Sequence, residues 1–180
     1  DREGRCDAVT MNLDTREIMA IGPVIPVLVI DDAAHAVPLA RALVAGGVRV
    51  LEVTLRTPAA LDVIRAMAGV EGAVVGAGTV LNPRDAERAV AAGARFLISP
   101  GLTDPLAKAA RDLAVPLLPG VANASDIMRG LDQGLTAFAL AILAILGDRA
   151  AAAEMGRAGR RYVVENWQWS QMAARLRQLL

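Results

Sequence analysis

Three polar residues alternate with apolar ones in a stretch that otherwise has the composition of a buried strand. In VRVLEVTLRT (48–57), single apolar residues separate Glu52, Thr54 and Arg56. Side chains two positions apart point to the same side of a strand, so these three share one face. A carboxylate and a guanidinium are costly to bury unless they are paired or used. Two interpretations follow: an ion pair between Glu52 and Arg56 at a strand end, or a site that takes a ligand.

Segments with the composition of short buried strands recur along the chain, and helical segments lie between them. The helical segments are rich in alanine, and several end in glycine, as helices commonly do. The expected strands are 24–30, 48–54, 73–80, 94–100, 115–121 and 135–140. Apolar strands joined by helices predict a parallel sheet covered by helices, either a doubly wound sheet or a β/α barrel.

The ends of the expected strands favour the barrel. In a β/α barrel, alternate strand residues point into the interior, and functional side chains cluster at the carboxyl ends of the strands. Small and turn-forming residues follow three of the strands: GAGT (76–79), SPG (99–101) and LPG (118–120). GAGTVL lacks the third glycine of the dinucleotide-binding fingerprint and follows the third strand, which disfavours a Rossmann fold. The predicted fold class is α/β: an incomplete parallel β/α barrel of the TIM type, with about six strands plus C-terminal helices.

Composition excludes several classes of function. The 180 residues carry 19 basic and 19 acidic side chains, and only 3% are aromatic, so a nucleic-acid surface is not expected. Cys6 and His35 are the only cysteine and histidine, which argues against a His/Cys metal site. His35 lies in a predicted helix, where a structural or surface role is expected. The longest apolar run, 137–146, is about half of the roughly 20 residues that cross a membrane. No signal peptide is recognisable, and an intracellular protein is predicted.

Several blocks of the sequence resemble, in order and spacing, one enzyme family. The blocks lie within about residues 20–138 and read GPVIPVLVI, HAVPLARALVAGGVRVLEVTLRT, VVGAGTVLNP, GARFLISPGLTDPL and PLLPGVANASDIMRGLDQGLTAF. They are similar to the 2-keto-3-deoxy-6-phosphogluconate (KDPG) aldolases, which also cleave 4-hydroxy-2-oxoglutarate (KHG). The resemblance implies a β/α barrel, usually homotrimeric, in the cytoplasmic Entner–Doudoroff pathway, with no metal and no organic cofactor. A lysine of these enzymes forms a Schiff base with the substrate keto group, and the products are pyruvate and an aldehyde.

The resemblance also implies roles for individual side chains. Glu52 matches the family's acid/base residue, which moves protons through water during Schiff-base formation and at the pyruvyl carbon. Arg56 matches the group that binds the substrate carboxylate, a task suited to its planar guanidinium. Thr79 matches a hydroxyl near that carboxylate, and Pro100 matches a residue that lines the pocket. The implied partner is a small-molecule 2-keto acid, with no nucleic acid and no membrane.

The Schiff-base lysine is absent from its expected position. On the sixth strand, where the family has this lysine, the sequence has Ala139. Lys108 is the only lysine of the chain, and its helical context, DPLAKAARDLA, places it outside the barrel. The family's strands seven and eight, with their glycine-rich phosphate site, have no counterpart. We therefore expect an aldolase-family domain that is inactive in KDPG or KHG cleavage, or a non-catalytic module that binds a 2-keto acid.

The last part of the chain departs from the family pattern. The expected segments are an N-terminal extension and lead-in at 1–19, with Met11 as a candidate natural start, an aldolase-like barrel portion at 20–146, and a helical tail of different origin at 147–180. The tail predicts two helices, 150–166 and 170–180, and resembles, more weakly, the C-terminal helices of sugar-nucleotide glycosyltransferases. The sequence is thus expected to be truncated or chimeric. A glycosyltransferase fragment is the remaining alternative, and the aldolase-like sequence before the tail contradicts it.

Overall fold

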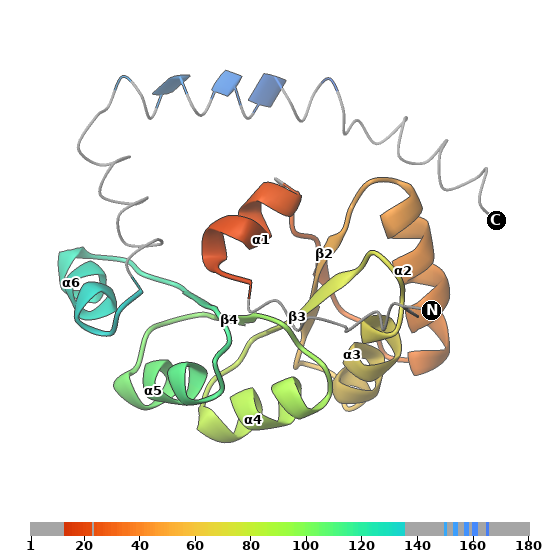
Figure 1. Ribbon diagram of the computed structural model, residues 1–180, viewed down its shortest axis with the longest axis horizontal. Coiled ribbons are helices and arrows are strands. Elements are labelled where there is room, and N and C mark those ends of the chain that lie inside the picture. The colour runs from red at the N-terminus through yellow and green to blue at the C-terminus, as the bar shows by residue number, and fades with distance from the viewer. Residues whose placement is uncertain are drawn as a thin grey trace, which may run out of the picture.

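The computed structural model describes residues 13–22 and 24–135, and in the tail residues 150, 153–154, 157–158, 160–161 and 165. Strands and helices alternate through the first part (Figure 1). The strands are β1 (Val27–Leu28), β2 (Val50–Thr54), β3 (Val74–Gly78), β4 (Leu97–Ser99) and β5 (Leu117–Pro119). The helices are α1 (Thr15–Ile21), the short 3-10 helix η1 (Ala33–His35), α2 (Ala36–Ala45), α3 (Ala60–Ala68), α4 (Pro83–Ala91), α5 (Asp104–Asp112) and α6 (Ala124–Asp132).

The strands form one parallel sheet in the order β1-β2-β3-β4-β5. Each strand pairs with the next strand in the chain, and a helix connects the two, which is the repeating unit of a β/α barrel. Helices α2 to α5 lie along the outer side of the sheet, and α1 lies on its inner side (Figure 1). The predicted parallel α/β architecture is confirmed, as five strands of an incomplete barrel among the described residues.

Two apolar clusters pack against the two faces of the sheet. The larger cluster lies between the sheet and the outer helices and includes Leu51 and Val53 of β2. The smaller cluster lies on the inner face and joins side chains from α1, β2 and β3 with one that precedes β4: Ile18, Val50, Val74 and Phe96. Residues of β2 therefore alternate between the two faces as the sequence predicted. By the same alternation, Glu52 and Thr54 belong to the inner face.

Helix α1 occupies the inner side near the amino ends of the strands, where Ile18 is fully buried. Its first turn carries a reciprocal capping box: the Asp14 and Glu17 carboxylates each accept a hydrogen bond from the other's backbone N–H, both at 2.7 Å. Residues 1–19 were expected to be an extension and lead-in, without this helix. The capping pattern DTRE was the signal that could have revealed it.

Helices α4 and α6 each begin at an asparagine side chain that caps them. Asn82 accepts a hydrogen bond from the Asp85 N–H at 3.0 Å, and Asn123 accepts one from the Asp126 N–H at 3.0 Å. These caps satisfy backbone donors that the first turn leaves free, and they fix where the loops after β3 and β5 end. The loops at the carboxyl rim of the sheet are consequently short and defined.

All five strands are shorter than the sequence predicted, and three of them are much shorter. The expected strands 24–30, 94–100 and 115–121 contract to β1, β4 and β5. Proline has no N–H to donate, so strand pairing is incomplete near Pro26 and Pro116. Their carbonyls still take part, because Pro26 O accepts from the Glu52 N–H at 3.1 Å and Pro116 O accepts from the Leu97 N–H at 2.9 Å.

Other expectations concern the C-terminal part of the chain. The expected strand 135–140 lies, apart from Leu135, outside the described residues, as does the expected helix 170–180. Every described residue between 150 and 165 is helical, in agreement with the predicted helix 150–166. The division into 1–19, 20–146 and 147–180 stays a prediction.

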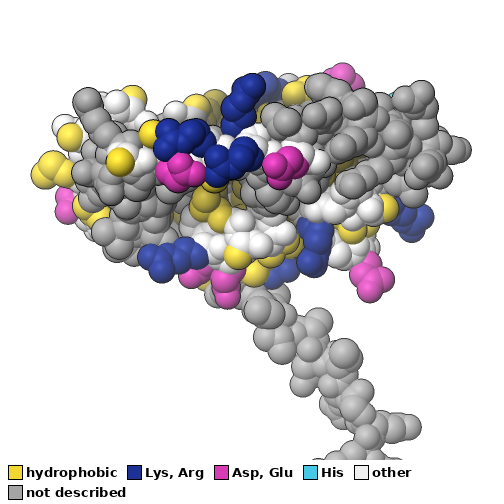
Figure 2. Space-filling model, turned by 90° about the horizontal axis from the view of Figure 1, so that it is seen from above, with side chains coloured by type: hydrophobic (Ala, Val, Ile, Leu, Met, Phe, Trp, Pro, Cys, Tyr) yellow, Lys and Arg dark blue, Asp and Glu magenta, His cyan; other side chains and the backbone are white. Residues whose placement is uncertain are grey.

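The described surface shows no separation of charge on the face seen in Figure 2, where basic and acidic side chains are interspersed with apolar ones. His35 is exposed at the start of α2, as expected for a surface residue. Among the helices that the structure describes, none is long and apolar enough to cross a membrane.

Candidate functional site

Glu52 lies in the middle of β2, between β1 and β3. Its strand partners are Val27 on β1 and Gly76 on β3, and its side chain is on the inner face of the sheet. Only 7% of the residue is exposed. Thr54, the next residue on this face, is fully buried, and its hydroxyl donates to Leu28 O at 3.2 Å. Thr54 therefore ties β2 to β1, whereas the carboxyl of Glu52 is the polar group left for chemistry.

The environment of Glu52 alters its proton affinity. Burial raises the pKa of the Glu52 carboxyl above its ordinary value, because the charged form loses hydration, and the positive charge of Arg56 opposes this rise in pKa. The net effect is a raised pKa. A carboxyl whose pKa lies above the ordinary range can exchange protons closer to neutral pH, which suits general acid/base chemistry.

Arg56 and Thr79 meet at the carboxyl ends of β2 and β3. The Arg56 Nε–H donates to Thr79 Oγ1 at 3.3 Å. No ion pair joins Arg56 to Glu52 among the described residues, so the interpretation of these two as a mutual ion pair is wrong. The other guanidinium N–H groups of Arg56 have no protein partner within the described part of the chain, and the residue is exposed. These N–H groups lie at the rim of the sheet, where an anion could accept their hydrogen bonds.

Thr79 has an unusual backbone conformation. Its φ is 59°, which is the left-handed region that a β-branched residue rarely adopts. The chain on either side is held by strand-type hydrogen bonds: the Leu55 N–H donates to Gly78 O at 2.9 Å, and the Val80 N–H donates to Ile98 O at 3.1 Å. Strained backbone of this kind persists only where its surroundings fix it, and it is frequent at functional sites. The sequence did not predict this feature.

Pro100 lies at the same rim but on the neighbouring strand pair. It follows β4 directly and is exposed. Its carbonyl approaches β5 so closely that a Cβ on Gly120 would lie 2.3 Å from Pro100 O. Within the described residues, no hydrogen bond joins Pro100 to Glu52, Arg56 or Thr79. The structure thus brings Arg56 and Thr79 together at the rim, places Glu52 on the inner face of β2, and leaves Pro100 at the rim without a hydrogen bond to them in the described part of the chain. Ala139, the expected lysine position, lies outside the described residues.

Ser99 is a rim residue that the sequence analysis did not single out as functional. It is 4% exposed, and its hydroxyl donates to Gly101 O and accepts from the Gly101 N–H. These two bonds close the turn that carries Pro100. The serine side chain that precedes the Pro-Gly pair in SPG was the available signal.

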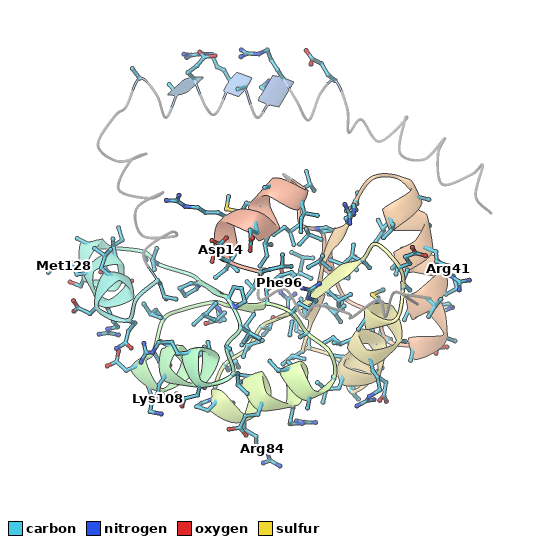
Figure 3. The ribbon with its side chains drawn as sticks, in the orientation of Figure 1. Asp14, Arg41, Arg84, Phe96, Lys108 and Met128 are labelled. Atoms are coloured by element: carbon cyan, nitrogen blue, oxygen red, sulfur yellow. The ribbon has the colours of Figure 1, made fainter. Side chains whose placement is uncertain are left out.

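Lys108 is located on the outer side of the molecule. It projects from α5 away from the sheet (Figure 3). Its ammonium pairs with the Asp112 carboxylate at 2.6 Å, and its side chain is 69% exposed. The prediction that Lys108 is a surface residue on the far side of the sheet is confirmed.

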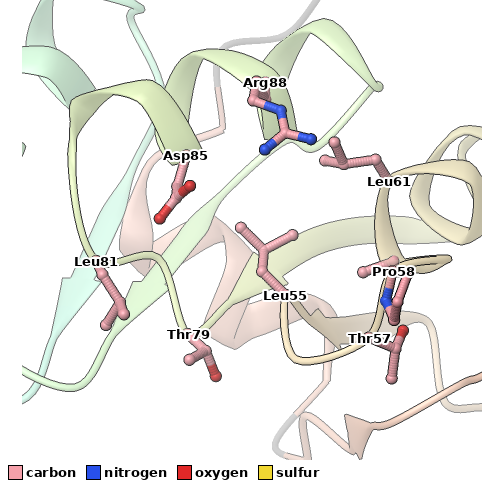
Figure 4. A pocket seen from close by; sticks show the side chains of 9 residues that line it. Leu55, Thr57, Pro58, Leu61, Thr79, Leu81, Asp85 and Arg88 are labelled. Atoms are coloured by element: carbon pink, nitrogen blue, oxygen red, sulfur yellow. The ribbon is translucent and has the colours of Figure 1, made fainter.

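A separate pocket lies on the outer side of the rim, between the starts of α3 and α4 (Figure 4). Its volume is about 260 Å³, and Leu61 and Arg88 face one another across it. Thr79 contributes to its wall, but Glu52, Arg56 and Pro100 do not. The pocket is therefore distinct from the inner face that carries Glu52. No group of three or more His, Cys, Asp or Glu side chains that could hold a metal ion occurs in the described part of the chain.

The parallel sheet, with an acidic residue buried on its inner face, defines a protein of the β/α-barrel class whose polar side chains lie where such proteins place their sites. Comparison with known proteins adds the family. A family model described as KDPG and KHG aldolase matches residues 15–156. The chain belongs to the KDPG/KHG aldolase family, as its sequence blocks predicted.

Individual relatives agree with this assignment. The KHG/KDPG aldolase of Escherichia coli (strain K12) is 58% identical over 122 residues, which are 67% of this chain and 57% of that protein. A crystal structure of the KDPG aldolase of Zymomonas mobilis ZM4 with 3-phosphoglycerate has a TM-score of 0.64 at 59% identity, over 66% of this chain and 57% of that one. The KDPG aldolase of Legionella pneumophila, with pyruvate captured at low pH as a covalent carbinolamine intermediate, has a TM-score of 0.63 at 49% identity, over 66% and 58% of the two chains.

The chain spans 57% of the length of the E. coli relative. The relatives named above are aldolases and give no support to the resemblance of 147–180 to glycosyltransferases. The family match itself continues to residue 156.

Proposed function

We propose that this chain binds a small 2-keto acid, with pyruvate as the simplest, through the acid/base and carboxylate-binding part of a KDPG/KHG aldolase site. The observation that carries the proposal is the buried Glu52 carboxyl, with its raised pKa, on the inner face of the sheet whose rim carries Arg56. Each of these groups is suited to one part of such a ligand: an arginine to the carboxylate, and a carboxyl that exchanges protons to the keto oxygen.

In this proposal Arg56 binds the substrate carboxylate. Its Nε–H is held by Thr79 Oγ1, which orients the guanidinium and leaves its terminal N–H groups to the ligand. The Thr79 hydroxyl can donate its own proton to the same carboxylate, because it acts as an acceptor toward Arg56. Pro100 forms the neighbouring part of the rim. The raised pKa of Glu52 suits it to exchange a proton with water or with the keto oxygen.

We also propose that this chain does not cleave KDPG or KHG by Schiff-base chemistry. In that reaction an uncharged amine attacks the keto carbon and water leaves, after which the iminium accepts the electron pair of the broken carbon–carbon bond. Ala139 has no amine at the position where the family resemblance places the lysine. Lys108 is solvated, paired with Asp112 and on the outer side of α5, so it cannot reach the inner face.

The relatives support the ligand class. The Legionella pneumophila enzyme holds pyruvate as a carbinolamine, and the Zymomonas mobilis enzyme holds 3-phosphoglycerate. By the same resemblance the protein would act in the cytoplasm, assemble as a homotrimer and need neither a metal nor an organic cofactor, and nucleic acid would not be a partner. A non-catalytic 2-keto acid module is the form of the proposal that fits a chain without the lysine.

Calorimetric titration with pyruvate tests the proposed contact. We expect weak binding by the parent chain and a loss of at least about tenfold in affinity for Arg56→Ala, because a charge-assisted hydrogen bond contributes about 1.5–3 kcal/mol. Arg41→Ala is the matched control, because it also removes one positive charge. Arg41 projects from α2 on the outer side of the molecule (Figure 3). Equal affinity of the parent and Arg56→Ala would refute the proposed carboxylate contact.

Borohydride trapping with pyruvate, read by intact mass, tests the second part. The parent chain should show no reduced pyruvate adduct beyond what Arg41→Ala and Lys108→Ala show. An adduct that disappears in Lys108→Ala would mean that Lys108 is a nucleophile after all.

A further inference from the structure

The carboxyl of Glu52 lies directly against the backbone of Gly78, the last residue of β3. A Cβ at Gly78 would lie 1.8 Å from Glu52 Oε1, 2.6 Å from Cδ and 2.8 Å from Cγ. Such distances are far shorter than any real contact of a Cβ. Gly78 has no positive φ, so an alanine there would meet no conformational strain of its own. What position 78 requires is therefore the space that a side chain would fill.

The surroundings limit where the Glu52 side chain could go if that space were filled. Val27 and Gly76 flank it on β1 and β3, and Val50 precedes it on the inner face as part of a packed cluster. The ring of Phe96 covers Gly76, where a Cβ would lie 2.3 Å from ring Cε2. A displaced carboxyl is therefore expected to move along the inner face toward the carboxyl rim, where Arg56 lies.

We propose that Gly78 is a positioning residue for Glu52. Because position 78 has no side chain, the Glu52 carboxyl can occupy the space beside β3, where the acid/base role of the proposed function needs it. The inference rests on that proposed function for its chemical meaning. Its structural content, the dependence of the Glu52 position on Gly78, stands on the contact itself.

The contact has a consequence for the protonation of Glu52. The neighbours of the Glu52 carboxyl carry no titratable group: they are Val27 on β1, Gly76 and Gly78 on β3, and Phe96 just before β4. Arg56 is the charged group that influences the carboxyl. A carboxyl displaced toward the rim would regain hydration and come nearer to the guanidinium. Both changes favour the ionised form, so its pKa would fall toward the ordinary range for glutamate.

The first test is Gly78→Ala in the full 180-residue chain, with the pKa of Glu52 followed by carbon-13 NMR of labelled glutamate and assigned with Glu52→Gln. We expect the pKa of Glu52 to be raised in the parent and to fall in Gly78→Ala. Gly69→Ala is the matched control, because Gly69 follows α3 far from the rim and its added Cβ would have an ordinary contact of 3.7 Å. A folded Gly78→Ala variant with an unchanged Glu52 pKa would overturn the proposal.

The second test removes the Glu52 side chain, so that the added methyl group at position 78 has nothing to displace. In a double-mutant cycle, Gly78→Ala should lower the urea midpoint in the parent and less in a Glu52→Ala background, because the side chain that the added methyl group displaces is gone. If Gly78→Ala alone does not fold, recovery of folding in the double variant gives the same support. An equal loss in both backgrounds, or a double variant that stays unfolded, would overturn the proposal.

These measurements separate the inference from the proposed function, since neither uses a ligand. A chain that fails to bind pyruvate but shows the Glu52 response to Gly78→Ala refutes the function and leaves the positioning intact. The reverse result refutes the positioning alone.

Discussion

Replacing Phe96 by alanine tests whether the inner apolar cluster supports the site. Phe96 is fully buried, and it packs with Ile18, Val50 and Val74 on the inner face of the sheet, which also carries Glu52. A buried aromatic side chain removes about 150–250 Å² from water, which at about 25 cal/mol per Å² corresponds to about 4–6 kcal/mol. Measured Phe→Ala costs in cores are about 3–5 kcal/mol, against a typical total stability of about 5–15 kcal/mol. Phe96→Ala should therefore lower the free energy of unfolding by a large fraction of its total.

The contact between Phe96 and Gly76 makes this prediction specific. In the parent, Gly76→Ala introduces a Cβ 2.3 Å from the ring, and such overpacking typically costs about 1–3 kcal/mol. In the Phe96→Ala background the same methyl group enters the space that the ring has left, so Gly76→Ala should cost less or stabilise. Urea unfolding of the parent, the two single variants and the double variant gives the coupling between the two sites.

Phe96→Leu is the control, because it keeps most of the apolar volume and should cost much less than Phe96→Ala. The reasoning fails if Gly76→Ala costs the same with and without the Phe96 ring. It also fails if Phe96→Ala changes the free energy of unfolding by less than about 0.5 kcal/mol, the range of ordinary surface substitutions.

Three further predictions concern the rim and the surface. The pKa of Glu52 in the folded state is raised above its ordinary value of 4.5. The stability that this shift contributes is present at a pH below the pKa of the unfolded state and is lost as the pH rises through the pKa of the folded state. Glu52→Gln should flatten this part of a urea-midpoint series against pH. Thr79→Gly should release backbone strain of about 1–3 kcal/mol, less about 0.5–1 kcal/mol for glycine's entropy, and so raise the urea midpoint while calorimetry shows weaker pyruvate binding; a lower midpoint would show that Thr79 is not strained. Lys108→Ala removes an exposed ion pair and should change the free energy of unfolding by less than about 1 kcal/mol without affecting pyruvate affinity, whereas a large change in affinity would contradict its surface role.

The alternation of β2 shows what the sequence could predict. Leu51 and Val53 face the outer helices, and Val50 and Glu52 face inward, because a strand has a period of two and only one arrangement buries the apolar side chains against helices. The parallel sheet follows from the same local patterns. The family could also be predicted, because long blocks of the sequence resemble it and not only a single motif.

The contacts across strands could not be predicted from the sequence. That Glu52 lies against Gly78, and that Arg56 meets Thr79, depends on the register of β2 and β3, which no local pattern fixes. The left-handed backbone of Thr79 was hidden for a related reason: the residue type disfavours it, and only the hydrogen bonds on either side impose it.

The central claim is that this chain retains the acid/base and carboxylate-binding side chains of its family without the amine that cleaves the substrate. A coupled measurement of pyruvate release from KDPG by the parent chain tests it most directly, with Ala139→Lys beside it. We predict no release above the uncatalysed rate for the parent and little for Ala139→Lys. Robust turnover by the parent that survives Lys108→Ala would contradict the claim.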